Sequence, residues 1–164
     1  MIFGISSAVL KRIIGMKINE PKTILFVEDD EVVLMAYRNR LQREGFRVES
    51  ARDGLEAMKI LLMSAPDLVI LDLMLPKFNG EEVLKFIRAE RRLKSLPVII
   101  FSTNSIIDAE HEPVLEGASR RLIKSTCTAS MLVSAIREAM ADESADNPDG
   151  KLRSPFSTIL QTAA

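Results

Sequence analysis

The chain of 164 residues has no tryptophan, one cysteine and one histidine, and aromatic residues make up only 5% of it. The single cysteine, Cys127, cannot form an internal disulfide, and this usage fits a reducing compartment. The lone His111 lies among acidic residues and has no second histidine with which to share a metal ion. The scarcity of aromatic residues argues against a platform on which nucleic-acid bases stack.

Neither sign of charge is in excess, because 22 lysines and arginines accompany 23 aspartates and glutamates, for a net charge of -1. A protein that coats nucleic acid is clearly basic, so we expect no nucleic-acid partner. Hydrophobic residues make up 47% and charged residues 27%, which is typical of a soluble globular domain. The length suffices for one domain with some spare chain at its ends.

No stretch approaches the ~20 apolar residues that cross a bilayer, so we expect a cytoplasmic protein with no integral membrane association. Residues 1–10 are fairly apolar, but Lys11 and Arg12 follow them, whereas a secretory signal carries its positive charge first. We expect residues 1–21 to form an extension, either flexible or helical with one apolar face for a partner or a membrane surface. A third alternative is that translation starts at Met16.

From Lys22 to Ala141, short apolar runs alternate five times with segments of helical periodicity. The runs predicted as strands are residues 23–27, 46–51, 68–71, 98–101 and 121–123. The predicted helices are residues 31–43, 53–63, 80–91, 105–116 and 128–140, the fourth of them interrupted by Pro113. The residues expected to face the core are Leu55, Met58 and Leu62 in the second helix, and Met131, Leu132, Ala135 and Ile136 in the last.

Unbroken apolar strands that alternate with helices predict an α/β fold, with helices on both faces of a parallel sheet. Right-handed crossovers favour a flavodoxin-like, doubly wound sheet of five strands in the order 2-1-3-4-5, with five helices. We expect residues 22–141 to form this one domain. Residues 142–164 are rich in polar and turn-forming residues and have little periodicity, so we expect a disordered C-terminal tail.

Polar side chains stand where four of the predicted strands end. Glu28 and Asp29 follow the first strand, and Asp72 follows the third. Ser102 comes at the end of the fourth strand, and Lys124 follows the fifth. Because the carboxyl ends of parallel strands share one edge of a sheet, we expect these side chains to meet in one shallow site.

Three carboxylates at close range repel one another unless a cation lies among them, and ligands that are all oxygen suit Mg²⁺. Lys124 would add a positive charge to this site, and Ser102 a hydroxyl donor. A metal ion, an ammonium group and a hydroxyl around one carboxylate can stabilise a phosphoryl group in transfer. In this interpretation Asp72 is the nucleophile that forms an acyl phosphate.

With these residues in place, the chain resembles the receiver domain of two-component response regulators, in the form of a chemotaxis-type single-domain receiver. The resemblance covers roughly residues 22–141. The segments that carry it are residues 24–31 (ILFVEDDE), residues 66–76 (PDLVILDLMLP) with Gly80, residues 96–102 (LPVIIFS), and Gly117 and Ala118 leading to Lys124.

The resemblance implies that Asp72 accepts a phosphoryl group from a histidine kinase or a phosphotransfer protein. It also implies Mg²⁺ as the cofactor. The implied magnesium ligands are Asp29, Asp72, the backbone carbonyl of Met74 and, through a water molecule, Glu28. Ser102 and Lys124 would contact the phosphoryl oxygens.

Three positions depart from the pattern of the family. Ser125 follows Lys124 where the family usually has proline, often after a cis bond. A non-proline cis bond costs about 2.5–4 kcal/mol, so either this bond is trans or strain is stored there. Arg121 stands where the family often has an aromatic switch residue, and Pro113 interrupts the preceding helix. All three positions fall on the face that commonly transmits the signal.

We therefore expect a stand-alone response regulator that signals by docking to another protein, with no activity beyond accepting the phosphoryl group and dephosphorylating itself. The alternative is a degenerate receiver that acts as an interaction module independent of phosphorylation, which the altered output face favours. An aspartate-based phosphohydrolase typically has a second aspartate two positions after the nucleophile, where this chain has Met74. A nucleotide- or flavin-binding protein is also disfavoured, because residues 28–30 are acidic and would repel phosphate.

Overall fold

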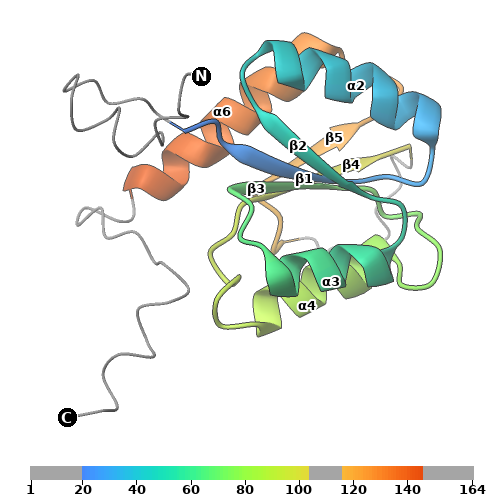
Figure 1. Ribbon diagram of the computed structural model, residues 1–164, viewed down its shortest axis with the longest axis vertical. Coiled ribbons are helices and arrows are strands. Elements are labelled where there is room, and N and C mark those ends of the chain that lie inside the picture. The colour runs from blue at the N-terminus through green and yellow to red at the C-terminus, as the bar shows by residue number, and fades with distance from the viewer. Residues whose placement is uncertain (1–19, 104–115, 146–164) are drawn as a thin grey trace, which may run out of the picture.

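The computed structural model describes residues 20–103 and 116–145, and these form a single α/β unit (Figure 1). The strands are β1 (Thr23–Val27), β2 (Arg47–Ala51), β3 (Leu68–Leu71), β4 (Val98–Ser102) and β5 (Arg120–Ile123). The helices in the described residues are α2 (Glu31–Arg43), α3 (Gly54–Met63), α4 (Gly80–Ala89) and α6 (Ala129–Ala145). The five strands form one sheet in the order β2-β1-β3-β4-β5, which confirms the predicted topology.

All strand pairs are parallel, and their register brings the strand ends level with one another. Val27, the last residue of β1, pairs with Leu71, the last residue of β3. In the same way Ser102 of β4 pairs with Ile123 of β5. The residues that follow these pairs therefore emerge beside one another at one edge of the sheet, as the sequence predicts.

Helices cover both faces of the sheet, with α2 and α6 on one face and α3 and α4 on the other (Figure 1). Side chains of β1 alternate between these two cores: Ile24 and Phe26 pack with residues of α2 and α6, and Leu25 and Val27 pack with residues of α3 and α4. Because both faces are buried, every position of the central strands must be apolar, which explains their unbroken hydrophobic runs.

Side-chain caps begin three of the helices immediately beyond the site edge. Asp30 is the N-cap of α2, and its side chain accepts hydrogen bonds from the backbone N–H groups of Val32 and Val33. Asp53 caps α3 in the same way, and Asn79 forms a reciprocal capping box at α4. These caps start the helices directly after short loops, which hold the strand-end residues in place.

Two expected core residues lie on the wrong side of their helices. Leu62 of α3 is 50% exposed, because Gly54, Ala57 and Leu61 face the sheet instead. Residues 60–63 are all apolar, so the pattern alone allows two overlapping stripes. Met131 of α6 is 49% exposed, because it lies one position, or about 100°, from the buried Leu132. The other expected core residues of α6, Ala135 and Ile136, are buried.

The ends of some elements also differ from the prediction. Helix α4 ends at Ala89 rather than at residue 91, and α6 continues to Ala145 rather than ending at residue 140. The helix expected at residues 105–116 lies outside the described residues apart from its last residue, as do residues 1–19 of the expected extension and residues 146–164 of the expected tail. Residues 142–145, expected to begin the disordered tail, are instead the last residues of α6. None of the helices in the described part of the chain has the length and apolar character needed to cross a bilayer.

The first residue of α4 is a glycine because the backbone before it passes too close for any side chain. A Cβ atom at Gly80 would lie 2.1 Å from the carbonyl oxygen of Asp72 and 2.7 Å from the Cα atom of Leu73. The Gly80 N–H group also donates a hydrogen bond to the Leu73 carbonyl over 2.9 Å. Glycine here lets α4 start directly against the loop that follows β3.

We predict that Gly80→Ala lowers the free energy of unfolding by about 1–3 kcal/mol, because backbone atoms must shift to admit the methyl group. Denaturant unfolding monitored by circular dichroism measures this change. Lys85→Ala is the matched control, since Lys85 lies on the exposed side of the same helix and its replacement should change stability by less than about 0.5 kcal/mol. Equal stability of the two variants would contradict the prediction.

Candidate functional site

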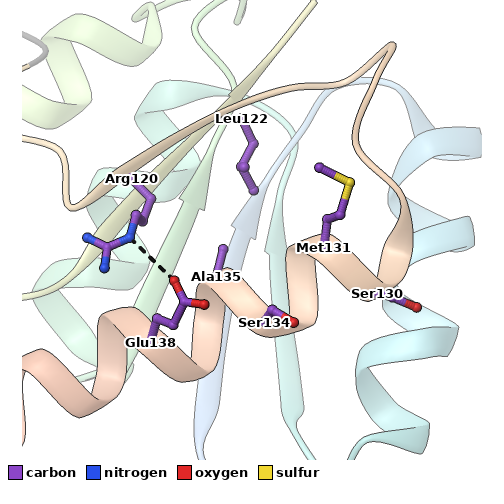
Figure 2. Close-up of a pocket in the computed structure, with 7 residues that line it drawn as sticks. All are labelled: Arg120, Leu122, Ser130, Met131, Ser134, Ala135 and Glu138. Atoms are coloured by element: carbon purple, nitrogen blue, oxygen red, sulfur yellow. Dashed lines mark ion pairs between the residues drawn. The ribbon is translucent and has the colours of Figure 1, made fainter.

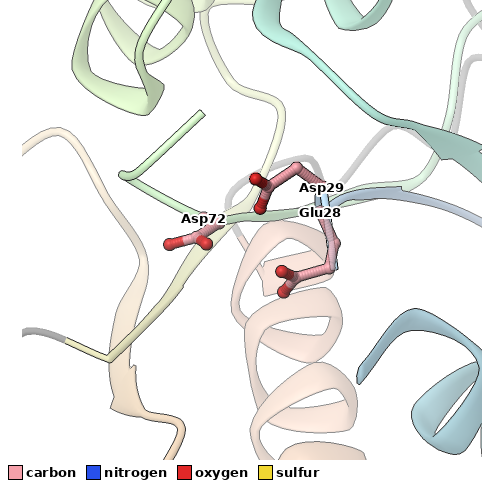
Figure 3. Close-up of side chains that lie close together, drawn as sticks. All are labelled: Glu28, Asp29 and Asp72. Atoms are coloured by element: carbon pink, nitrogen blue, oxygen red, sulfur yellow. The ribbon is translucent and has the colours of Figure 1, made fainter. Parts of the chain in front are cut away.

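Three carboxylates converge where β1 and β3 end. Glu28 and Asp29 follow β1 and Asp72 follows β3, and one oxygen of each lies within 4.8 Å of the others (Figure 3). Glu28 is fully buried, Asp72 is 4% exposed, and Asp29 is exposed to solvent. The group therefore has two buried acids at its base and one acid at its opening.

Lys124 provides the positive charge that these acids need. Its Nζ atom lies 2.6 Å from Glu28 Oε2 and 2.6 Å from Asp72 Oδ2. Burial works against the charged form of this lysine, but hydrogen bonds and the charges of Asp72 and Glu28 outweigh it and raise the pKa of Lys124. Burial also raises the pKa of Glu28, although Lys124 acts in the opposite direction.

Ser102 offers a hydroxyl that nothing in the described protein satisfies. Its side chain is only 2% exposed, and its Oγ atom has no hydrogen-bond partner. A buried polar atom of this kind is uncommon in a native protein, because it loses its bonds to water without replacing them. At the carboxyl edge of β4, this hydroxyl is suited to an incoming ligand rather than to the protein itself.

The loop of residues 73–79 is held in place by several contacts around Asp72. The Met74 N–H group donates to Asp72 Oδ1 over 3.2 Å. Lys77 adopts a left-handed backbone conformation with φ at 67° and forms an ion pair of 2.5 Å with Asp53, the cap of α3. The loop thus contacts the start of α3 through Lys77 and contacts Asp72, the expected phosphoryl acceptor, through Met74.

The donor set fits a hard divalent cation. All three clustered side chains offer oxygen, and within the described ranges they form the one group of three or more such residues. Mg²⁺ is bound in proteins by a small number of carboxylates together with water, so an open cluster with one exposed acid suits it. The partnerless hydroxyl of Ser102 adds an independent sign that an oxygen-rich ligand belongs at this edge.

The structure thus brings together the side chains of Glu28, Asp29, Asp72 and Lys124, as the sequence predicts. Ser102 ends the neighbouring strand β4, and its backbone carbonyl accepts a hydrogen bond of 2.9 Å from the Lys124 N–H group. No peptide bond in the described residues is cis, so the bond between Lys124 and Ser125 is trans, one of the two alternatives left open above. His111 and Pro113 lie outside the described residues.

A groove runs between β5 and α6, away from the acids. Arg120, Leu122, Ser130, Met131, Ser134, Ala135 and Glu138 line it (Figure 2). Arg120 forms an ion pair across this groove, because its Nε atom lies 3.8 Å from Glu138 Oε2. Arg121 is exposed, as expected of a side chain that replaces a buried aromatic ring.

A doubly wound sheet whose carboxyl edge holds acids beside a lysine is the arrangement of a signalling receiver, and sequence comparison agrees. The profile of the response regulator receiver domain matches residues 24–137. The chain belongs to this family. The polar-differentiation response regulator DivK of Brucella anthropi is 27% identical over 122 residues, which cover 74% of this chain and 98% of DivK.

Solved receiver domains have the same architecture. The receiver domain of a signal transduction histidine kinase from Syntrophus aciditrophicus is similar with a TM-score of 0.66 and 27% identity, over 74% of this chain and 91% of that chain. TrrA from Thermotoga maritima, in complex with Mg²⁺-BeF, is similar with a TM-score of 0.65 and 28% identity, over 72% of this chain and 98% of that chain. A CheY-like receiver domain protein from Methanospirillum hungatei is similar with a TM-score of 0.70 and 23% identity, over 77% of this chain and 98% of that chain. At this identity the similarity supports the fold alone.

We predict that Lys124→Met lowers the free energy of unfolding in metal-free buffer by as much as about 3–5 kcal/mol, because it leaves buried carboxylates without a counter-charge. Lys77→Met is the matched control, since Lys77 also pairs with an aspartate but is 59% exposed, and its loss should cost about 0–1 kcal/mol. Chemical denaturation of both variants compares them. Similar losses for the two lysines would show that the Lys124 pair is no more important than a surface contact.

Proposed function

We propose that this receiver domain accepts a phosphoryl group on Asp72 from a histidine kinase or a phosphotransfer protein, and that it signals by binding another protein. The observation that carries the proposal is the Lys124 ammonium group, which lies 2.6 Å from the Asp72 carboxylate. Ser102 ends β4, the strand next to that of Asp72, and its buried hydroxyl has no partner among the described residues. An ammonium and a hydroxyl placed next to a carboxylate suit the developing charge of a transferred phosphoryl group.

The proposed reaction moves the phosphoryl group from nitrogen to oxygen. A carboxylate oxygen of Asp72 attacks the phosphorus of a phosphohistidine, an O–P bond forms, and the P–N bond breaks. The bonding electron pair stays with the imidazole nitrogen of the donor, which takes up a proton from water. The Met74 N–H group orients Asp72 through Oδ1. Lys124 and Ser102 then contact oxygens of the new acyl phosphate.

Asp29, Asp72 and the backbone carbonyl of Met74 would hold Mg²⁺ directly, and Glu28 would hold it through water. When bound, the ion neutralises charge on the phosphoryl oxygens. The acidic cluster supports this assignment, as does the similarity to TrrA, which was solved with Mg²⁺-BeF. In this structure the charge of Lys124 partly balances the charges of Glu28 and Asp72. A bound metal ion would balance these acids instead, which would leave the Lys124 ammonium group available to contact the phosphoryl group.

A second function, an interaction module independent of phosphorylation, is favoured by the residues that flank Lys124. Arg121 is exposed where the family often has an aromatic switch residue, and Ser125 replaces the usual proline. The retained acids, hydroxyl and lysine favour the phosphorylated receiver over this alternative. We propose a cytoplasmic setting, where phosphohistidine donors act, and an activity limited to phosphoryl acceptance and self-dephosphorylation.

We predict that incubation with acetyl phosphate and Mg²⁺ adds the mass of one phosphoryl group, and that Asp72→Asn abolishes the addition because an amide cannot serve as the nucleophile. Intact-mass spectrometry measures it. Asp67→Asn is the matched control, since Asp67 precedes the same strand at the opposite edge of the sheet and pairs with Lys22. A mass increase that persists in Asp72→Asn would identify a different acceptor.

We predict that Asp29→Asn weakens Mg²⁺ binding by at least about tenfold, and that Glu28→Gln weakens it less, because a direct ligand is harder to replace than one acting through water. Isothermal titration with Mg²⁺ gives both affinities. Asp30→Asn is the control, because asparagine still caps α2 and should leave the affinity within about twofold. If Glu28→Gln causes the larger loss, the ligand assignment is wrong.

A further inference from the structure

Three aromatic side chains form a cluster beneath the proposed phosphorylation site. The ring of Tyr37 from α2 meets the ring of Phe101 edge-on, with centroids 5.0 Å apart. Phe26 contacts both rings, at 6.1 Å from Phe101 and 6.4 Å from Tyr37. Phe101 directly precedes Ser102, so this cluster supports the strand ends that carry the site.

Lys124 rests on this cluster. Its Nζ atom lies 5.8 Å from the centroid of the Phe101 ring, within the range of an attraction between a cation and an aromatic face. Tyr37 packs against the same ring. Movement of Lys124 toward a phosphoryl group would therefore change the surroundings of a ring pair that includes Tyr37.

Tyr37 also reaches the turn that follows Lys124. Its hydroxyl donates a hydrogen bond of 2.9 Å to the backbone carbonyl of Cys127. Cys127 is tied in turn to the end of β5, because its N–H group donates to the Ile123 carbonyl over 2.9 Å. Tyr37 is thus joined to both sides of Lys124, through Phe101 on one side and through Cys127 on the other.

Packing alone does not explain why residue 37 carries a hydroxyl group. A phenylalanine would fill the same space in the core, but a partly buried phenol needs a hydrogen-bond partner, and here the partner belongs to the loop after Lys124. Burial raises the pKa of the Tyr37 phenol, so the group remains a hydrogen-bond donor at neutral pH.

We propose that Tyr37 is a positioning residue for Lys124. Its hydroxyl fixes the turn of residues 124–127, and its ring holds Phe101 beneath the ammonium group. This inference rests on the proposed function, in which Lys124 contacts the phosphoryl oxygens. It also assigns α2 a role in the switch, which matters because Arg121 supplies no aromatic ring on β5.

The chain contains its own reporter for this proposal. It has no tryptophan and one tyrosine, so tyrosine emission comes from Tyr37 alone. Beryllofluoride with Mg²⁺ mimics the phosphoryl group and serves as the probe. We expect the tyrosine emission of the full wild-type chain to change when beryllofluoride is added to the Mg²⁺-bound protein, and unchanged emission at saturation would overturn the proposal.

The matching variant is Tyr37→Phe, which keeps the ring and removes only the hydroxyl. We expect its affinity for beryllofluoride to fall by about 3- to 10-fold, the effect of one hydrogen bond, while its affinity for Mg²⁺ alone stays unchanged. Cys127→Ala, which keeps the accepting carbonyl, should bind beryllofluoride like the wild type. Both affinities are measured by titration with the full chain.

The outcomes separate this inference from the function on which it rests. If the wild type binds no beryllofluoride, the proposed function fails and this inference fails with it. If the wild type binds the probe and Tyr37→Phe binds it equally well, the positioning role alone is overturned. Equal losses of Mg²⁺ and beryllofluoride affinity in Tyr37→Phe would also overturn it, because they indicate a general structural effect rather than positioning of Lys124.

Discussion

An ammonium group held between two buried carboxylates is the constraint on which the rest of this structure depends. Lys124 lies 2.6 Å from both Glu28 and Asp72, and none of the three side chains is more than 10% exposed. Like charges cannot be buried together without a counter-charge, so the ends of β1, β3 and β5 must stay level. The parallel register of the sheet and the tight start of α4 at Gly80 both serve this alignment.

The sheet and the residues at its carboxyl edge could be predicted from the sequence because each rests on a local pattern. Apolar runs bounded by acids define the strands, and parallel pairing then places Asp72 beside Glu28 without further information. The inward face of α3 could not be predicted in this way. Residues 60–63 are all apolar, so their pattern does not decide which of them faces the sheet; in the structure Leu61 is buried, and Leu62 and Met63 are exposed.

Long-range contacts around the site were beyond sequence reasoning for a different physical reason. The bond from Tyr37 to Cys127 joins residues 90 positions apart, and it depends on how α2 meets the turn after β5. The ion pair between Lys77 and Asp53 spans 24 positions and depends on the left-handed backbone at Lys77. Tyr37 is partly buried against the core, but nothing in the sequence indicates the partner of its hydroxyl.

The two outer strands of the sheet each begin with arginine: Arg47 in β2, and Arg120 followed by Arg121 in β5. An outer strand has unpaired backbone groups along one side, and these can recruit the strand of another molecule. Charged side chains on an outer strand disfavour its pairing with the strand of another copy. The arginine at position 121, where the family often has an aromatic ring, therefore places a charge on the outer strand β5.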